Sequence, residues 1–477
     1  MSDDVLLIFD PPGAAQILRA LSACPEVSGA IASYWVPHMP HHDSSSTPAS
    51  GAASTRRDFI RLSTAAALAA VPASAHVAGS DVIKVGIIGC GNRGPDAALN
   101  AMRAGQDVHI VAMGDMLLDR IQESRSAMKL KFPEQVEVPD ENCFTGFEAY
   151  KHVIEASDVV IIANAAKFHS FHALAAIQAG KHVFVEKPHA IDPVGIQRLK
   201  QACELAKTKN LSLVSGLQSR YHLGYQETMQ RVHDGAIGEI VAIQETWLRP
   251  PYVLYQRRPG MSEVEYQASN QYHFHWLSGD DVPQTLIHNL DRSSWALHNA
   301  APTRCYAMGG RSTLHGEVYG STFDHNAVVY DFPKGVRVYA FCRTIDNCYN
   351  ENSSLILGSK GRCDLLNLRI TGESNWESTS AKSKASAYDL EHVALFNGIR
   401  TGKPVNNGDY MARSTQIGIM GQFSSYTGQE VTWEQFDKSD FFYPPLPEDV
   451  SLDMEPPVKL GPDGLYPTFV PGVTKLL

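Results

Sequence analysis

Three glycines spaced as Gly89-x-Gly91-x-x-Gly94 are the residues whose type and spacing most directly indicate chemistry. They follow a short apolar run rich in β-branched residues and precede a run at 96–104 that suits a helix, with Pro95 in its first turn. In that order the glycines permit a tight turn, a close approach of backbone to a pyrophosphate, and close packing of helix on strand. Asn92 and Arg93 complete the turn at a helix N-terminus, which favours phosphate. The motif predicts a dinucleotide-binding site.

Asp115 is the second candidate for nucleotide contact. A strand predicted at 108–113 ends just before it, about 20 residues after the glycines. A carboxylate there accepts hydrogen bonds from the adenosine ribose and repels a 2′-phosphate, so NAD is favoured over NADP. Arg120 lies close enough in sequence to soften that preference, so NADP stays possible. The alternative is that Asp115 only caps a helix that starts near Met116.

These residues need a parallel sheet to position them, and residues 81–219 alternate strand and helix as such a sheet requires. Further strands are predicted at 158–163, 182–185 and 211–215, with helices at 172–178 and 196–207. The prediction is an α/β fold that begins with a doubly wound parallel sheet of the Rossmann type.

The pattern changes after Gly216, and residues 220–442 are predicted to form a second α/β domain with an open, mixed or largely antiparallel sheet. A helix is expected at 221–234, followed by strands at 240–248, 303–308, 327–332, 336–343, 353–358 and 363–370. Two late helices are expected at 389–401 and 410–426. The proline-rich tail at 443–477 is expected to wrap the surface without regular structure.

Composition narrows the class of protein. A chain of 477 residues with 44% hydrophobic residues suits two globular domains. A formal net charge of −10 argues against nucleic acid or an anionic membrane surface as the main partner. The eight cysteines form no C-x-x-C pair, and His273-x-His275 has no third ligand at convincing spacing, so no disulfide framework and no metal site are predicted.

The N-terminus carries a predicted export signal at 54–80. Ser54-Thr55-Arg56-Arg57-Asp58-Phe59 resembles the twin-arginine consensus, and an alanine-rich apolar run and an Ala73-Ser74-Ala75 cleavage motif follow it. The apolar run is too short for a permanent membrane span. Residues 1–53 are predicted to be disordered, or to precede a true start at Met39. The protein is therefore expected in the periplasm, exported already folded by the twin-arginine machinery.

A second landmark is the run A-G-K-H-V-F-V-E-K-P at 179–188, where a strand delivers Glu186 and Lys187 to the edge at which such sheets bind ligands. Together with the glycine turn, Gly235-Ala236-Ile237-Gly238-Glu239 and His288-Asn289-Leu290-Asp291, it resembles the glucose–fructose oxidoreductase / inositol dehydrogenase / MocA (Gfo/Idh/MocA) family from about 81 to 433. Members have a Rossmann domain followed by an α/β domain that forms the substrate cleft and often mediates oligomerisation, so a homo-oligomer (dimer or tetramer) is expected.

The resemblance implies that Lys187 is catalytic, its ammonium polarising the substrate hydroxyl, while Glu186 orients the loop beside a bond before Pro188 that can be cis. It also implies that His288 accepts the hydroxyl proton. The family places an acidic residue four positions before this histidine, and here Gln284 stands there. Gln284 can still hydrogen-bond a sugar hydroxyl, and Asp291 is the candidate to replace the missing carboxylate in part.

After the strand at 158–163 the family motif is altered to Ala163-Asn164-Ala165-Ala166-Lys167-Phe168-His169. Asn164 and His169 are expected near the nicotinamide ribose. Lys167 either selects an anionic substrate or points into solvent. The aromatic and basic segment at 249–281 is a candidate sugar-recognition loop or a subunit interface. Arg220 and Tyr272 are the further candidate substrate contacts.

The leading hypothesis is an exported NAD(P)-dependent oxidoreductase that takes a hydride from a secondary alcohol of a sugar, glycoside or cyclitol. Because the periplasm is not expected to supply free nicotinamide nucleotide, the cofactor should stay tightly bound. One alternative is redox-neutral chemistry (a glycoside hydrolase, lyase or epimerase) through a transient keto-sugar. The other is a non-catalytic sugar-binding protein, against which intact Lys187 and His288 count.

Overall fold

The computed structural model describes residues 82–382 and 385–477. The predicted disordered or mis-assigned start at 1–53 and the predicted export signal at 54–80 lie outside the described residues. Within the two described ranges, no helix is both long and apolar enough to cross a membrane.

The first domain contains a six-stranded sheet in which every neighbouring pair is parallel. Its strands are β1 (Ile83–Ile88), β2 (Val108–Asp115), β3 (Cys143–Thr145), β4 (Val159–Ile162), β5 (His182–Val185) and β6 (Leu213–Ser215). They lie in the order β3-β2-β1-β4-β5-β6, which is the Rossmann order. The strand order reverses next to β1, so the glycine turn that follows β1 lies where such sheets bind ligands. The predicted fold is confirmed.

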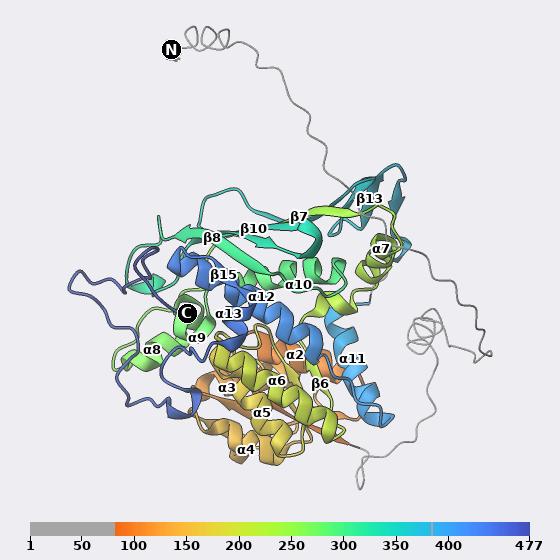
Figure 1. Ribbon diagram of the computed structural model, residues 1–477. Coiled ribbons are helices and arrows are strands. Elements are labelled where there is room, and N and C mark those ends of the chain that lie inside the picture. The colour runs from red at the N-terminus through yellow and green to blue at the C-terminus, as the bar shows by residue number, and fades with distance from the viewer. Residues whose placement is uncertain (1–81, 383–384) are drawn as a thin grey trace, which may run out of the picture. The chain divides into compact units, whose positions relative to one another are not determined.

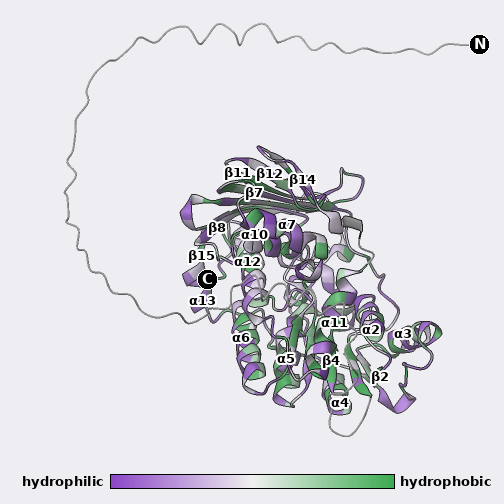
Figure 2. Ribbon diagram, turned by 90° about the vertical axis from the view of Figure 1, so that its right-hand side faces the viewer, coloured by the Kyte–Doolittle hydropathy of each residue, from purple (hydrophilic) through white to green (hydrophobic). Residues whose placement is uncertain are grey.

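Helices cover both faces of this sheet. On one face lie α2 (Arg93–Arg103), α3 (Leu118–Lys131) and the late helix α11 (Ala387–Arg400). On the other lie α4 (Ala149–Ala156), α5 (His169–Gln178) and α6 (Pro193–Thr208). Burial on both faces explains why the strands read as continuous apolar runs, and Figure 2 shows hydrophobic strands between helices with hydrophilic outer residues.

The second domain contains a nine-stranded sheet, ordered β14-β13-β12-β11-β7-β10-β9-β8-β15. Its strands are β7 (Ile240–Arg249), β8 (Arg304–Gly310), β9 (His325–Asp331), β10 (Arg337–Thr344), β11 (Glu351–Gly358), β12 (Gly361–Asp364), β13 (Arg369–Gly372), β14 (Trp376–Glu377) and β15 (Val431–Thr432). Only β7 and β10 pair in parallel, and the other neighbours are antiparallel. This confirms the predicted largely antiparallel sheet.

Three helices cover one face of the second sheet: α7 (Leu223–His233), α10 (Ile287–Ala296) and α12 (Gly408–Thr427). Figure 1 shows α10 and α12 between this sheet and the Rossmann domain, and α12 also packs against α6. The shorter helices are α8 (Glu263–Ser269), α9 (His275–Ser278) and α13 (Trp433–Lys438). Because α10 and α12 lie between the two sheets, residues of the second domain reach the carboxyl ends of the parallel strands.

Two details differ from the sequence prediction. The strand expected at 363–370 is a hairpin of β12 and β13, in which Asp364 accepts a hydrogen bond from the Asn367 amide and Leu368 takes a positive φ of 55°. Buried apolar residues precede and follow the turn, so the sequence pattern looks like that of one continuous strand. The tail at 443–477 has only a short 3-10 turn, as expected, but it does not simply wrap the surface: Tyr443 and Tyr466 belong to the core of the second domain.

Candidate active site

The glycine turn has the geometry that its spacing predicts. Gly89 has φ +98°, and a Cβ there would lie 2.5 Å from the Asn164 nitrogen. A Cβ on Gly94 would lie 1.8 Å from the Gly89 carbonyl oxygen, so helix α2 can start this close to β1 only with glycine. At Gly91 a Cβ would meet nothing within 4 Å. The space over Gly91 is therefore open to a ligand, whereas the other two glycines are required by the fold itself.

Asp115 is the last residue of β2 and lines the cavity above the glycine turn. Its carboxylate accepts hydrogen bonds from the Cys90 amide at 2.7 Å and from the Leu117 amide at 3.1 Å. It does not cap α3, whose N-cap residue is Leu117. Through the hydrogen bond from the Cys90 amide, Asp115 stabilises the glycine turn while it also lines the cavity. Arg120 lines the same cavity.

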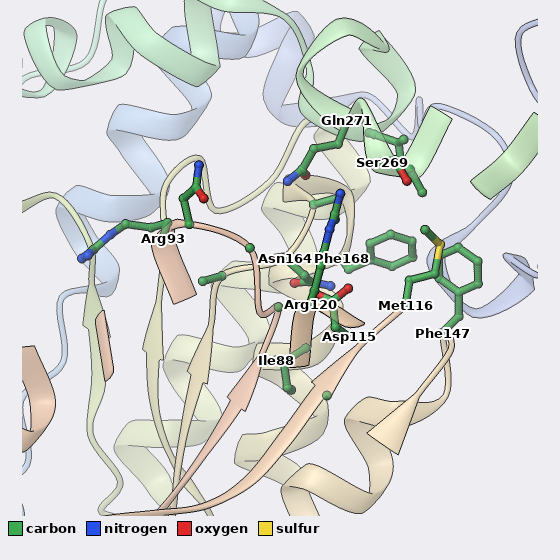
Figure 3. Close-up of a pocket in the computed structure, with 18 of the residues that line it drawn as sticks. Ile88, Arg93, Asp115, Met116, Arg120, Phe147, Asn164, Phe168, Ser269 and Gln271 are labelled. Atoms are coloured by element: carbon green, nitrogen blue, oxygen red, sulfur yellow. The ribbon is translucent and has the colours of Figure 1, made fainter. Parts of the chain in front are cut away.

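The cavity over the glycine turn has a volume of about 320 Å³. Its floor comes from the Rossmann domain, and its roof comes from residues 252–272 of the second domain, here named the roof segment. Figure 3 shows Ser269 and Gln271 of the roof segment on the side of the cavity opposite Asp115 and Asn164.

The residues that line this cavity, from here on named the dinucleotide cavity, fit a nicotinamide dinucleotide. The open space over Gly91 suits a pyrophosphate, and α2 begins without a side-chain cap, so its first amides are free for phosphate oxygens. Asp115 lies at the place of the ribose-binding carboxylate. Asn164, whose Oδ1 is buried without a hydrogen-bond partner, stands between this cavity and a second one.

The second cavity, of about 320 Å³, contains Lys187 and His288 and is here named the catalytic cavity. It shares Arg93, Asn164 and Tyr272 with the first cavity, so the two adjoin. Lys187 follows β5 and its peptide bond to Pro188 is cis, as considered from the sequence. Its Nζ donates to the Gln284 carbonyl oxygen at 2.9 Å, and burial lowers the pKa of Lys187 to about 8.

His288 and Gln284 both face the catalytic cavity, although they do not share one regular helix. Gln284 lies in a π-helical turn (Val282–Leu286), and His288 lies in the first turn of α10. Burial, reinforced by the charge of Lys187, holds the pKa of His288 well below its usual value. The ring is therefore neutral at neutral pH.

Glu186 and His169 hold the loop around Lys187. Glu186 is buried and accepts hydrogen bonds from Arg93 Nε at 2.5 Å and from the Lys187 amide at 3.2 Å. The His169 ring lies 2.7 Å from the Pro188 carbonyl oxygen and 2.9 Å from that of Asn164, so it links the loop after β5 to the loop after β4. Both residues line the catalytic cavity.

Two predicted substrate contacts lie outside both cavities. Arg220 and Asp291 form a bidentate ion pair, with Nη2 to Oδ1 at 2.8 Å, and Asp291 also accepts a hydrogen bond from Ser414. A fully buried carboxylate needs such partners. The expectation that Asp291 would partly replace the missing acidic residue beside His288 therefore has no support, because Asp291 is committed to Arg220.

Lys167 takes neither of the positions expected for it. It is buried, its Nζ donates to the Tyr443 carbonyl oxygen at 2.7 Å, and burial lowers its pKa to about 8. It thus anchors the C-terminal tail to the Rossmann domain. The histidines at 273 and 275 lie outside the catalytic cavity: His273 is buried, and the partly buried His275 has its Nδ1 2.8 Å from the Ser321 hydroxyl oxygen. In residues 82–382 and 385–477 no three His, Cys, Asp or Glu side chains are grouped to hold a metal.

The catalytic cavity also has residues that the sequence prediction did not name as site residues. Trp247 and Arg249 come from the inward face of β7, and Tyr388 comes from α11. The Arg249 guanidinium carbon lies 3.6 Å from the centre of the Tyr252 ring, and Arg249 Nη2 donates to Asp281 Oδ1 at 3.1 Å. Alternation along β7 could have identified Trp247 as inward-facing. No sequence signal connects Tyr388 to Lys187, about 200 residues earlier.

Five residues that line the catalytic cavity each have a buried polar side-chain atom that lacks a hydrogen-bond partner. The atoms are Asn164 Oδ1, Gln218 Oε1, Arg249 Nε, Gln284 Oε1 and His288 Nδ1. Unpartnered buried polar atoms are costly, and so many around one cavity indicate that a ligand supplies their partners. The set contains both donors and acceptors, and aromatic rings stand beside it, an arrangement suited to a ring that carries several hydroxyl groups.

Residues 83–215 match the Gfo/Idh/MocA family model, described as an oxidoreductase family with an NAD-binding Rossmann fold. The chain is 26% identical over 338 residues to inositol 2-dehydrogenase of Pseudomonas fluorescens, covering 67% of this chain and 87% of that protein.

Solved structures share the fold. Myo-inositol 2-dehydrogenase from Lactobacillus plantarum is similar with a TM-score of 0.54 at 19% identity, over 74% of this chain and 99% of that one. GenD2 from gentamicin A biosynthesis, solved in complex with NAD, is similar with a TM-score of 0.57 at 16% identity, over 76% and 99%.

Proposed function

We propose that this chain, an oxidoreductase of the Gfo/Idh/MocA family, transfers a hydride from a secondary alcohol of a cyclitol, sugar or glycoside to NAD that stays bound. The observation that carries the proposal is the set of five unpartnered donors and acceptors on residues that line the cavity of Lys187. A cavity of this size holds a small polyhydroxylated ring. The inositol 2-dehydrogenase relative makes a cyclitol the first substrate to try.

In this reaction Lys187 holds the reacting oxygen. Its Nζ uses one N–H on the Gln284 carbonyl oxygen, which leaves the others for a substrate hydroxyl, and the ammonium stabilises negative charge that develops on that oxygen. Neutral His288 accepts the hydroxyl proton. Gln284 and Arg249 offer hydrogen bonds to neighbouring hydroxyl groups. The dinucleotide, when bound, supplies the hydride acceptor.

The test is to purify the protein, release and identify its nucleotide, and incubate the loaded protein with myo-inositol and a panel of sugars and glycosides. We expect reduction of the bound nicotinamide that persists until a keto acceptor is added. Cleavage of a glycoside without net reduction would instead support the redox-neutral alternative. Absence of both nucleotide and spectral change would leave a sugar-binding protein.

We also propose that the protein is exported with its cofactor already bound. The twin-arginine motif at 54–59 and the cleavage motif at 73–75 support export, and the roof segment supports retention of the cofactor. Arg258 of the roof segment pairs with Asp119 of α3 at 3.2 Å. Hydrogen bonds join the roof segment to the C-terminal tail. Gln267 donates to the Val458 carbonyl oxygen at 2.6 Å, and Tyr466 donates to Glu263. Recovery of the cell-associated protein with residues before 73 intact would contradict export.

Tyr255 provides a test of retention. Its ring lies 5.4 Å from the Arg120 guanidinium across the dinucleotide cavity and is 43% exposed, so its loss should spare the fold. We expect Tyr255→Ala to speed NAD release about fivefold, because a cation–π contact and part of the roof are lost, together worth ~1 kcal/mol. Release is measured by the nucleotide left after timed gel filtration. Tyr349→Ala, at a site 72% exposed and outside both cavities, is the control; equal release in both variants would contradict the role of the roof.

A homo-oligomer through the outer face of the nine-stranded sheet completes the proposal. Tyr306, Val329, Tyr339, Gln244 and Leu355 form one row across five strands on the face away from α10 and α12. Nearby Met308 is 76% exposed. Apolar and aromatic residues in such a row are typical of an interface, and a monomeric mass by light scattering would contradict it.

A further inference from the structure

Arg93 is the one charged residue of the glycine turn, and its side chain leaves the nucleotide side of that turn. Figure 3 shows it pointing away from Asp115 and Asn164. Arg93 is the first residue of α2 and lines both the dinucleotide cavity and the catalytic cavity. It therefore stands between the part of the site that binds the cofactor and the part that contains Lys187.

The contact that matters is with Glu186. Arg93 Nε donates to Glu186 Oε1 at 2.5 Å, and the other carboxylate oxygen accepts from the Lys187 amide. Glu186 cannot shift easily, because a Cβ on neighbouring Gly216 would already lie 2.8 Å from its carboxylate. Glu186, a single buried carboxylate, thus contacts both the Arg93 guanidinium and the backbone amide of Lys187.

A second carboxylate, Glu391 on α11, lies on the far side of Arg93. Its Oε1 is 3.6 Å from Arg93 Nη2, the side chain is fully buried, and neither oxygen has a hydrogen-bond partner. Burial, with the charge of Glu186 adding to it, holds the pKa of Glu391 well above its usual value. The closer ion pair of Arg93 is that with Glu186, at 2.5 Å against 3.6 Å for Glu391.

We propose that Arg93 is a positioning residue that acts through Glu186 to set the charge carried by Lys187, linking the nucleotide-binding turn to the catalytic cavity. That Lys187 is catalytic rests on the proposed function; the electrostatic link does not. Arg93 need not touch the substrate for this role. It acts on the lysine by neutralising the carboxylate that would otherwise favour the ammonium form.

The charges around Lys187 determine the sign of the effect. Burial lowers its pKa most; Glu186 and Asp281 raise it, while Arg249 and Arg93 lower it. The other titratable groups that face it are His169, His288, Tyr252, Tyr272 and Tyr388. Arg93→Gln removes a cation and leaves Glu186 unpaired, and both changes favour the ammonium. Glu186→Gln removes the anion and leaves Arg93 unpaired, and both changes favour the neutral amine.

The experiment measures the charge of Lys187 directly. The purified protein is labelled with acetic anhydride across a range of pH, and acetylation of the Lys187 peptide is followed by mass spectrometry. We expect the midpoint to rise by about one pH unit in Arg93→Gln and to fall by about one in Glu186→Gln. Arg103→Gln is the matched control, since Arg103 also lies on α2 and pairs with an α11 carboxylate, Asp389, at 3.3 Å, but does not line the catalytic cavity; its midpoint should equal that of the wild type.

If Arg93 and Glu186 had only a structural role, the two substitutions would not move the acetylation midpoint of Lys187 in opposite directions. Unchanged midpoints, or midpoints that move in the same direction, would overturn the proposal. If Arg93→Gln does not fold, Arg93→Lys and Glu186→Gln test the proposal. Arg93→Lys should keep the wild-type acetylation midpoint, and Glu186→Gln should still lower it. Acetylation reports on the charge of the Lys187 amine and not on turnover. The measured midpoints therefore test the electrostatic link even if replacing Lys187 leaves turnover unchanged and the proposed function fails.

Discussion

Replacement of Lys187 with methionine is expected to lower the rate of nicotinamide reduction by about 1,000-fold while leaving the nucleotide content unchanged. Methionine preserves length and apolar volume but removes the cation that holds the reacting oxygen. The main structural cost is one lost hydrogen bond to the Gln284 carbonyl oxygen, ~1 kcal/mol, so the protein should remain folded. The measurement is single-turnover reduction with myo-inositol, paired with the nucleotide content of the same sample.

Lys181→Met is the matched control. Lys181 precedes the same strand, β5, at its opposite end, where its Nζ donates to the Ser157 carbonyl oxygen at 2.5 Å. This variant should reduce its cofactor at the wild-type rate. In the wild type the rate should fall as the pH rises through about 8, because Lys187 then loses the proton that makes it an ammonium. A Lys187→Met variant with undiminished turnover would show that this amine is not catalytic.

Gly91→Ala is expected to weaken NAD binding roughly 5- to 150-fold without destabilising the protein. The new methyl group meets nothing of the protein within 4 Å, so it occupies space reserved for the ligand. If the backbone accepts alanine without strain, the unfolded chain loses entropy and the nucleotide-free protein gains ~0.4–1 kcal/mol. Calorimetric titration with NAD and thermal unfolding of the nucleotide-free protein measure the two effects separately.

Gly94→Ala provides the contrast within the same turn. Its methyl group would lie 1.8 Å from the Gly89 carbonyl oxygen, so strand β1 and helix α2 must separate. This variant should lower the melting temperature even without nucleotide, whereas Gly91→Ala should not. If Gly91→Ala bound NAD as tightly as the wild type, the pyrophosphate could not lie over Gly91.

The sequence alone was sufficient for features encoded by neighbouring residues. A strand, a tight turn and a helix N-terminus need only local contacts, so the glycine motif predicted the turn. Asp115 and the run at 179–188 placed the ends of two further strands. The continuous apolar runs predicted a sheet buried on both faces for the same reason.

Only the tertiary structure decided which side chains meet in the catalytic cavity. Helical spacing puts Asp291 one turn from His288, but a buried carboxylate takes the strongest available partner, and Arg220 provides it. Tyr388 comes from α11, far along the chain, and the roof over the cofactor comes from the second domain and depends on the tail. These contacts join residues distant in sequence, and their geometry follows from how two sheets and their helices pack, which no local pattern of residue types encodes.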